Sequence, residues 1–401
     1  MKSISHLEEF GINRTDNDSK IRILFIIDIL YGVGGTEKQL LELIKRIDKK
    51  RFACYVCPFR YTTEMIERVT ELGGEVWPAP VKRMYGLSGI HQAGAIIKKI
   101  RQHKIDIVST YHFIADTYGV LISKLAGVPC IISNRRDTGD HQHNKYARLI
   151  QWLDRFVERY LAVCTEVSEH IEKHHHIDKG KIKVIYNGID VESTQKIDRK
   201  ETERLRQRYH INGKNFVIGN ISHVRPEKGY DVFFEAVRRV KDQIPELQVF
   251  AVGDGLPEER EMVRRLAREK EVEGKVIFTN YVRNPLDYIS LLDVACLTPV
   301  RNEGFSNALL EEMTLAKPIV ATDVGANAEA IVDGESGFIV PPGDPEALAQ
   351  AMIKYYRNPQ LRRQMGQAAL QRVKNNFTLD KTISTLEATY LSLYAKTQNL
   401  N

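Results

Sequence analysis

The sequence has no long apolar run and few cysteines. None of its hydrophobic segments approaches the ~20 residues that a helix needs to cross a bilayer. The first 19 residues are polar and lack the apolar core of a secretion signal, so we expect a flexible tail over residues 1–19. Five cysteines, an odd number, argue against a disulfide framework and favour a reducing compartment. We therefore expect a cytoplasmic globular protein.

Excess positive charge is confined to the first half of the chain. Residues 1–190 hold 29 Lys and Arg against 23 Asp and Glu, whereas the remainder is balanced and the whole chain has a net charge of +6. This asymmetry predicts an anionic partner for the first half. No nucleic-acid recognition motif accompanies the charge, so we expect no nucleic-acid binding. An anionic inner-membrane surface or a phosphorylated acceptor fits better.

One part of this basic half could meet a membrane surface. Basic residues between Lys82 and Lys104 precede a predicted helix over residues 146–160 that carries Leu149, Trp152, Leu153 and Phe156. Together they could form an interfacial patch. Ordinary core packing of the apolar residues is the stronger alternative.

Apolar strands alternate with helical patterns along most of the chain, beginning with the buried-type strand Ile21–Leu30. A polar, charge-rich connection over residues 191–212 separates two such blocks. This alternation predicts an α/β protein with two Rossmann-like parallel-sheet domains, residues 20–190 and 213–377, joined by a linker.

Several polar residues come directly after predicted strands of the first block. Because ligands bind beyond the carboxyl ends of parallel strands, these residues could line a binding cleft. They are His112, Asn134, Arg135 and Arg136. Gly34 and Gly35 lie in a strand-to-helix turn that would let the backbone approach a phosphate, although the Rossmann glycine spacing is not met.

The second block has a strand-to-helix loop with two cations, Arg225 and Lys228. Arg binds a phosphate bidentately and Lys binds it as a point charge, so both suit a diphosphate. The alternative is an exposed turn in which Pro226 and Gly229 serve geometry alone.

The most informative stretch lies between Val300 and Met313. Glu303 precedes a flexible Gly304, and either Ser306 or Asn307 can cap a helix that carries Glu311 one turn inside it. The free amides at this helix start suit a phosphate, and the carboxylates would bind hydroxyls on either side of it. A nucleotide diphosphate sugar has that layout, with Glu303 at the sugar and Glu311 at the ribose. Solvated charges near a helix start are the plainer alternative.

Two metal-like patterns carry less weight. Cys54 and Cys57 lie on a predicted strand, where residues three apart face opposite sides, and no second pair exists. The histidines at 174–176 fit a solvated helix end. We expect no metal site.

The ordered motifs resemble those of the group 1 glycosyltransferases (family 4) of the GT-B fold, over roughly residues 20–395. The matching motifs are Gly34-Gly35-Thr-Glu37, Tyr186-Asn-Gly-Ile-Asp190, Arg225-Pro-Glu-Lys-Gly229, Val252-Gly-Asp-Gly255, Glu303-Gly-Phe-x5-Glu311, Lys317-Pro-Ile-Val-Ala-Thr-Asp-Val-Gly325 with Glu329, and Asp333-Gly-x2-Gly-Phe. The resemblance implies two Rossmann-like domains facing each other across a cleft, with a last helix (378–396) that returns to the first domain. It also implies sugar transfer from a nucleotide diphosphate sugar with retention, without cofactor or metal.

Carried over by residue, the resemblance makes Glu303 the carboxylate beside the donor sugar and Glu311 the ribose ligand. Lys228 would neutralise the leaving diphosphate. Gly34 and Gly35 would close over the phosphates. The amides of Phe305 and Ser306 would contact the sugar or the diphosphate.

Two positions depart from the family pattern. Many members have the diphosphate-binding Arg where this chain has His223, and we expect Arg225 to take that role. Many members also have a sugar-contacting histidine where this chain has Arg135, and His112 is a possible substitute.

The sequence therefore predicts a retaining glycosyltransferase that moves a hexosyl or N-acetylhexosaminyl group from a UDP-sugar to a hydroxyl of a glycan or polyprenyl-diphosphate-linked acceptor, as in bacterial surface-polysaccharide assembly. Peripheral association with the inner membrane face is expected through the basic first half. Two alternatives remain: a nucleotide-sugar epimerase or hydrolase of the same fold, and a non-catalytic nucleotide-sugar-binding subunit of an assembly complex.

Overall fold

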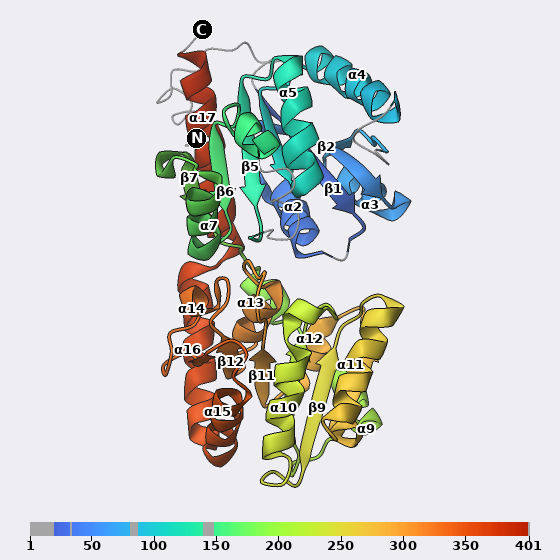
Figure 1. Cartoon of the computed structure of the whole chain (residues 1–401), viewed down its shortest axis with the longest axis vertical. Coiled ribbons are helices and arrows are strands. Elements are labelled where there is room, and N and C mark those ends of the chain that lie inside the picture. Colours follow the sequence, from blue (N-terminus) through green and yellow to red (C-terminus); the bar gives the residue numbers. More distant parts are fainter. Residues whose placement is uncertain (1–19, 33, 81–86, 139–147, 400–401) are drawn as a thin grey trace. The chain divides into compact units, whose positions relative to one another are not determined.

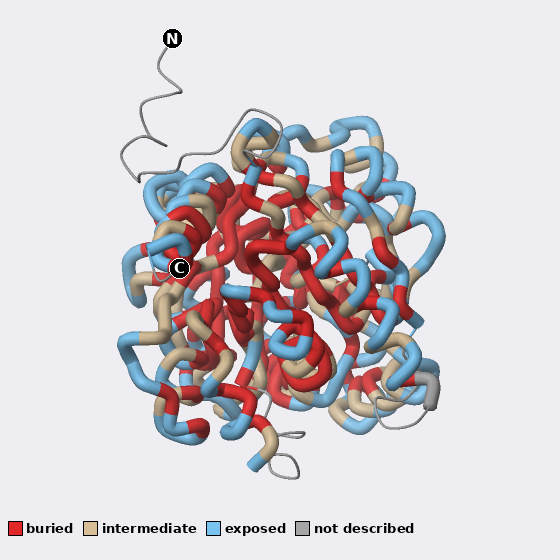
Figure 2. Tube along the Cα trace, turned by 90° about the horizontal axis from the view of Figure 1, so that it is seen from above, coloured by how far each residue is buried: buried red, intermediate tan, exposed pale blue. Residues whose placement is uncertain are grey.

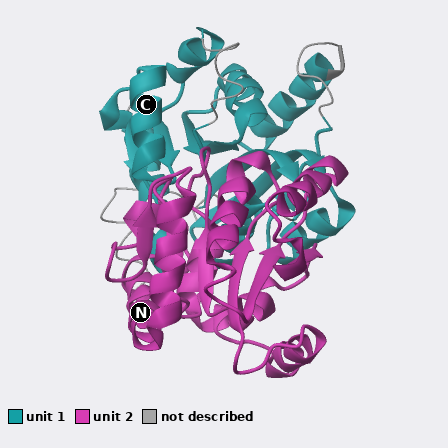
Figure 3. Cartoon of the chain, turned by 60° about the horizontal axis from the view of Figure 1, so that its bottom comes forward, with its two compact units in different colours: residues 1–186, 380–401 teal, residues 187–379 magenta. Residues whose placement is uncertain are grey.

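The computed structural model describes residues 20–32, 34–80, 87–138 and 148–399. The chain divides into two compact units, one formed by residues 1–186 with 380–401 and the other by residues 187–379 (Figure 3). The expected tail over residues 1–19 lies outside the described residues.

The first unit is built on a seven-stranded sheet in the order β3-β2-β1-β4-β5-β6-β7, and the pairings between neighbouring strands are parallel. Its strands are β1 (Ile21–Leu30), β2 (Phe52–Tyr61), β3 (Glu75–Val76), β4 (Ile107–Tyr111), β5 (Cys130–Arg135), β6 (Arg159–Ala162) and β7 (Ile182–Val184). Helices cover both faces, so β4 and β5 are buried at every residue and β1 at nearly all, without alternation (Figure 1).

The helices of this unit mostly follow the strands as βα connections. They are α2 (Gly35–Arg46), α3 (Thr63–Glu71), α4 (Leu87–Gln102), the π-helical turn η1 (Ala115–Gly119), α5 (Val120–Ala126), helical residues 148–154, α7 (Thr165–His175), the 3₁₀ turn η2 (Lys179–Lys181) and α17 (Leu379–Gln398). From Asp380 on, α17 packs on the first sheet: Lys183 Nζ lies 2.9 Å from Thr389 Oγ1, and Phe52 contacts the ring of Tyr390.

The second unit contains a six-stranded sheet in the order β10-β9-β8-β11-β12-β13, again with parallel pairings. Its strands are β8 (Phe216–Ile221), β9 (Leu247–Val252), β10 (Val276–Asn280), β11 (Val294–Leu297), β12 (Ile319–Thr322) and β13 (Phe338–Val340). Its helices are α8 (Val191–Thr194), α9 (Arg199–Arg208), η3 (Pro226–Lys228), α10 (Tyr230–Val240), α11 (Pro257–Glu269), η4 (Glu273–Lys275), α12 (Pro285–Leu291), α13 (Asn307–Thr314), α14 (Asn327–Ala330), α15 (Pro345–Arg357) and α16 (Pro359–Asn376).

The segment predicted as a linker, residues 191–212, differs from that description. It folds into α8 and α9 inside the second unit, and Asp198 caps α9 through the amides of Lys200 and Glu201. The helix α9 is almost wholly polar because it buries only Leu205. A single buried side chain leaves too little apolar periodicity to be seen in the sequence.

Each unit has its own apolar core. Buried residues run along the strands, and exposed residues occupy the outer sides of the surrounding helices (Figure 2). The core of the second unit packs Phe233 and Phe234 of α10 against the sheet, and that of the first packs Leu24 and Ile26 of β1 against the helices. All five cysteines are free and buried.

In both sheets the strand order reverses at one place. The reversal falls between β1 and β4 in the first unit and between β8 and β11 in the second. At such a switch point the connections leave toward opposite faces, so the carboxyl ends of the two strands flank a crevice that is suited to a ligand. The residues predicted to act on the donor follow these strands.

Candidate active site

Lys228 and Glu303 meet at the switch point of the second unit. Lys228 follows β8 and Glu303 follows β11, yet Lys228 Nζ lies 2.5 Å from Glu303 Oε2. Both side chains are partly exposed, at 22% and 12%. The sequence analysis proposed both residues without predicting that they touch.

The two loops that carry this pair are clamped to each other by the main chain. The amide of Val300 donates to Glu227 O at 2.8 Å, and Thr298 Oγ1 donates to Lys228 O at 3.0 Å. Gly229 has φ +64°, and a Cβ there would lie 2.0 Å from Thr298 O. Glycine is therefore required at this position by both conformation and space. Gly229 thus serves the geometry of the loop, and a diphosphate contact by Arg225 or Lys228 stays a prediction.

A third loop supports the backbone of Glu303 and Gly304. The amide of Ala326 donates to Gly304 O at 2.8 Å. Gly325, with φ +63°, approaches so closely that a Cβ would lie 2.5 Å from Gly304 O and 2.7 Å from Glu303 O. This contact explains Gly325 in the sequence motif, because any side chain would displace the loop that aims Glu303.

The helix after Glu303 begins as the sequence predicted, and the structure decides between its two possible caps. Ser306 is the cap, since its Oγ accepts from Leu309 N at 3.4 Å, whereas Asn307 is the first helical residue. Asn187 Nδ2 donates to Phe305 O at 2.8 Å, and the ring of Phe305 packs edge-on against Phe377. The peptide before the helix is thereby fixed in place.

Two adjacent glutamates of α13 are both buried. Glu311, the predicted ribose ligand, is 5% exposed, and Glu312 is completely buried. Burial raises the pKa of Glu312 well above its ordinary value, with a further contribution from Glu311. Neither carboxyl oxygen of Glu312 has a hydrogen-bond partner within the described residues. Burial therefore favours the neutral form of Glu312.

Arg225 and His223, the two candidates for holding the diphosphate, are both exposed in the loop after β8. Arg225 caps the short turn that carries Lys228, and its carbonyl accepts from Lys228 N at 3.1 Å. Gly253 and Gly255 let the loop after β9 pack closely against the loop after β8 that carries Arg225. A Cβ at Gly253 would lie 1.9 Å from Ser222 O, and one at Gly255 would lie 2.5 Å from Val224 O.

In the first unit, Glu37 organises the glycine-rich turn after β1. Its carboxylate accepts hydrogen bonds from the amides of Tyr31, Gly32 (3.2 Å) and Gly34 (2.5 Å), and the residue is only 3% exposed. Gly34 caps α2 and Gly35 is the first residue of that helix. The sequence analysis used Glu37 only as part of a motif, and the structure shows that it holds the turn in shape.

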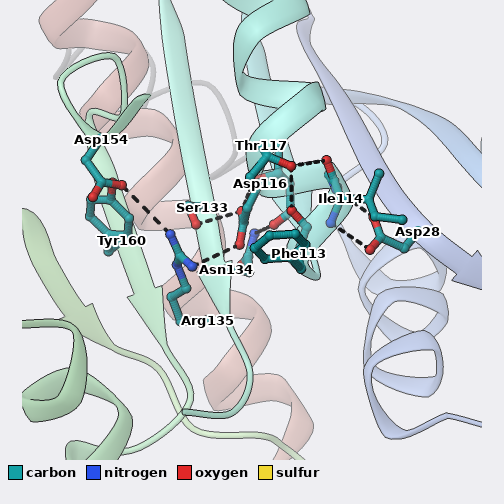
Figure 4. A network of polar contacts seen from close by, with 12 residues as sticks. Asp28, Phe113, Ile114, Asp116, Thr117, Ser133, Asn134, Arg135, Asp154 and Tyr160 are labelled. Carbon is teal, nitrogen blue, oxygen red and sulfur yellow. Dashed lines mark hydrogen bonds and ion pairs between the residues drawn. The ribbon is translucent and has the colours of Figure 1, made fainter. Parts of the chain in front are cut away.

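Asp28, near the end of β1, supports the start of the helix after β4. Its carboxylate accepts from Ile114 N at 2.8 Å and Ala115 N at 2.6 Å (Figure 4). Burial raises its pKa to about 7. The sequence analysis did not select Asp28, although a single carboxylate inside an otherwise apolar strand was a visible signal.

Arg135 lies in a buried network of charges (Figure 4). Its Nη1 is 3.4 Å from Asp116 Oδ2, its Nη2 is 3.9 Å from Asp154 Oδ1, and its guanidinium lies 5.5 Å from the centre of the Tyr160 ring. Its side chain is 7% exposed. The described contacts thus engage Arg135 with protein groups, and a sugar contact by this residue stays a prediction.

The neighbouring Asn134 is also engaged with the protein. Its Nδ2 donates to Ser109 Oγ at 2.7 Å and to Thr110 O at 3.0 Å, and the residue is 5% exposed. These bonds tie β5 to β4. A ligand contact by Asn134 likewise stays a prediction.

His112 and Arg136 directly follow the carboxyl ends of β4 and β5. His112 follows β4 with φ +72°, and its Nδ1 is buried without a hydrogen-bond partner among the described residues. Burial lowers its pKa to about 4, with Arg136 and Arg60 adding repulsion. The ring is therefore neutral at pH 7 among cations. Arg60, at the end of β2, is a further candidate that its exposed position on a strand did not suggest.

The described part of the chain holds no group of three or more His, Cys, Asp or Glu residues that could bind a metal ion. Among the helices described, none has the length and apolar character needed to cross a membrane.

Two family models match the chain in series: "Glycosyltransferase Family 4" over residues 33–193 and "Glycosyl transferases group 1" over residues 201–372. Among curated proteins, the trehalose synthase of Pyrococcus horikoshii is 28% identical over 58% of this chain and 57% of its own length. The lipopolysaccharide core biosynthesis mannosyltransferase LpcC of Rhizobium leguminosarum is 28% identical over 69% of this chain and 75% of its own.

Solved structures show the same fold at low identity. HepE of Anabaena, solved with UDP and glucose, superposes with a TM-score of 0.82 at 20% identity, covering 93% of this chain and 100% of that one. The glycosyltransferase WaaG superposes with a TM-score of 0.71 at 15% identity, covering 90% and 99%. With both family models matched in order and the two sheets arranged as described, the chain belongs to the group 1 (family 4) glycosyltransferases of the GT-B fold.

Proposed function

We propose that the protein is a retaining glycosyltransferase that moves a sugar from a UDP-sugar to a hydroxyl group of a glycan or lipid-linked acceptor. The observation that carries this proposal is the contact between Lys228 and Glu303 at the switch point of the second sheet. The bond to be broken joins a sugar carbon to a diphosphate oxygen. An ammonium and a carboxylate 2.5 Å apart can act on the two sides of that bond.

In this proposal each residue has a distinct task. Lys228, with Arg225, neutralises the diphosphate as the sugar–oxygen bond breaks. Glu303 holds a hydroxyl of the sugar and stabilises the positive charge that develops on it. The acceptor oxygen forms the new bond on the face from which the diphosphate leaves, and the acceptor proton passes to the departing diphosphate oxygen. No metal is required, because lysine, arginine and helix amides supply the positive charge.

The ends of the donor are assigned to α13 and to the loop before it. The amides near Phe305 and Ser306 suit the diphosphate, because the start of α13 carries free N–H groups. Glu311 binds the ribose diol. Gly34, Gly35 and His112 of the first unit are proposed as contacts for the phosphates and the sugar. The solved complex of HepE with UDP and glucose supports a UDP-sugar as donor.

The acceptor and its pathway are proposed by analogy. Relatives include a lipopolysaccharide core mannosyltransferase and a capsular polysaccharide glycosyltransferase of Staphylococcus aureus. A glycan or polyprenyl-diphosphate-linked acceptor in bacterial surface-polysaccharide assembly fits these names and the basic first half of the chain.

The proposal is tested by binding and by turnover. Calorimetric titration with UDP and GDP, without metal, should show binding of UDP that Lys228→Ala abolishes. Glu303→Gln should bind UDP normally and transfer sugar at least 100-fold more slowly, because it loses charge stabilisation in the transition state. Near-normal turnover in Glu303→Gln would remove the assignment.

Adjacent residues of α13 provide a matched pair of variants. Glu311→Gln should weaken UDP binding about tenfold or more, since it weakens charge-assisted hydrogen bonds to the ribose. Glu312→Gln changes the adjacent carboxyl group, which is completely buried and whose neutral form burial favours, and should leave UDP affinity unchanged. Product analysis with and without acceptor separates transfer from hydrolysis or epimerisation, which need no acceptor. UDP binding without any product would favour a non-catalytic binding subunit.

A further inference from the structure

Apolar and basic side chains lie together on the surface of the first unit, at the edge of its sheet where β5 and β6 begin. Trp152 is 42% exposed and Leu125 is 57% exposed, although both are large hydrophobic residues. They belong to two elements, the helical residues 148–154 and the carboxyl end of α5. Within the same unit, Gly34 and His112 lie at the opposite edge of the sheet, where β1 and β4 end.

Contacts between neighbouring side chains join these residues into one continuous surface. Arg155 lies 5.8 Å from the ring centre of Trp152, whose ring packs edge-on against Phe156 at 5.0 Å. Lys124 lies 5.3 Å from the ring centre of Phe156, and it precedes Leu125 in α5.

The helix α4 adjoins the same surface, lying beside α5 (Figure 1). Arg101 Nη2 donates to Leu125 O at 2.8 Å and Arg101 Nε donates to Ala126 O at 3.3 Å, so this cation is fixed beside the exposed leucine. We name the surface formed by Arg101, Lys124, Leu125, Trp152, Arg155 and Phe156 the Trp152 patch.

The Trp152 patch is basic as well as apolar. Asp154 is the single acidic residue in α4, α5 and residues 148–156. Asp154 is 8% exposed and faces Arg135 and Tyr160 inside the unit, so it does not offset the surface cations. The nearby Glu158 is paired with Lys396.

This combination fits a lipid surface better than a folded acidic partner. Trp and Leu side chains enter the headgroup boundary of a bilayer, and Lys and Arg bind anionic headgroups beside them. The cations here lie over aromatic rings, where they can stay solvated while the apolar groups insert. Leu153 is a core residue, as the packing alternative predicted, whereas Trp152 is exposed and its membrane role is part of the proposal.

We propose that the Trp152 patch is the surface by which this protein docks on an anionic membrane. The inference rests on the proposed function for its purpose, since docking would bring the enzyme to a lipid-linked acceptor. Its test is independent of catalysis.

The chain supplies its own probe for this experiment. It contains two tryptophans, and Trp77 is 3% exposed, so a change in emission on membrane binding reports on Trp152. The full chain is titrated with phosphatidylcholine vesicles and with vesicles of phosphatidylcholine and phosphatidylglycerol (3:1) at 150 mM NaCl. We expect a blue shift and reduced acrylamide quenching with the anionic vesicles alone.

Variants then locate the binding surface by cosedimentation with the anionic vesicles. Each basic residue near an anionic bilayer contributes about fivefold to partitioning, so Lys124→Glu/Arg155→Glu should reduce binding at least 25-fold. Leu125→Ser/Trp152→Ser should reduce it about tenfold. The matched control, Lys173→Glu/Tyr281→Ser, changes one exposed cation and one exposed aromatic outside the patch and should bind as the natural protein does.

Three results would overturn the inference. The first is no emission change with anionic vesicles. The second is equal vesicle binding by the patch variants and the control. The third is binding to a soluble polyanion such as heparin with the same affinity and no change at Trp152. UDP titration of the same variants keeps the two proposals separate, because normal UDP binding shows an intact donor site whatever the vesicles do.

Discussion

Replacing Arg135 by methionine tests whether this residue supports the fold or the substrate. Arg135 Nη1 and Nη2 face Asp116 and Asp154, and all three residues are at most 8% exposed. Methionine keeps much of the volume and removes the charge, which leaves two buried carboxylates without their cation. Breaking a buried ion pair in this way costs roughly 3–5 kcal/mol. We expect Arg135→Met to lower the unfolding free energy of the first unit by about that amount at pH 8.

The loss should depend on pH in a defined direction. Burial raises the pKa of both carboxyl groups in the natural protein, that of Asp154 to about 6, and Arg135 counteracts the rise. Without Arg135 both pKa values rise further. A carboxyl group with a raised folded-state pKa destabilises the fold as the pH increases through that pKa. The difference between variant and natural protein should therefore be largest at pH 8 and shrink toward pH 5, as the two buried carboxyl groups take up protons.

Tryptophan emission during urea unfolding measures this difference. Both tryptophans belong to the first unit, so the signal follows that unit even when the second unfolds separately. Arg136→Met is the control, because it removes the adjacent cation and leaves Arg135 in place beside Asp116 and Asp154. An Arg135→Met protein as stable as the natural one at pH 8, but with a raised KM for the donor, would refute the structural role and restore the sugar contact.

Three further variants test the supports of the site. Gly229→Ala should lower the unfolding free energy by more than about 1 kcal/mol and weaken UDP binding at least tenfold, because its Cβ would lie 2.0 Å from a carbonyl oxygen. Gly274→Ala is the calorimetric control, since Gly274 has open space around it. Glu37→Ala should leave the amides of the glycine-rich turn unpaired and lower kcat/KM for the donor about tenfold, with UDP binding less affected. Burial raises the pKa of Asp28 to about 7, so ionising this group lowers the unfolding free energy by up to about 4 kcal/mol between pH 4 and pH 8. Asp28→Asn should remove this fall. An unchanged dependence of the unfolding free energy on pH, measured by urea unfolding, would contradict this cause.

The sequence predicted the fold well because the central strands are buried on both faces. Apolar runs such as Ile21–Leu30 can hardly be anything but strands when flanked by turn residues, and nearly all of that run is buried. The segment that was misjudged, residues 191–212, has a weak pattern. Its helix α9 buries only Leu205, so the local sequence shows almost no apolar periodicity.

For the site, the sequence identified residue types and the structure supplied their partners. Glu303 and Lys228 were selected separately, 75 positions apart, and their contact follows from the strand order. The residues that sequence reasoning missed act through backbone groups. Glu37 accepts hydrogen bonds from backbone amides, and Asn187 donates one to the carbonyl of Phe305. A side chain that bonds to the main chain produces no characteristic spacing of residue types in the sequence.

The charged groups described in the two units differ in exposure, and this difference explains why candidate site residues were easier to identify in the second unit. In the second unit, Lys228 and Glu303 contact each other and are both partly exposed, so a ligand can replace their contact. In the first unit, Asp28, Asp116 and Arg135 are buried and bonded within the protein. They hold an irregular helix start in place below His112. From its position at the end of β5, Arg135 suggests a ligand contact. Its burial between Asp116 and Asp154 favours a structural role instead.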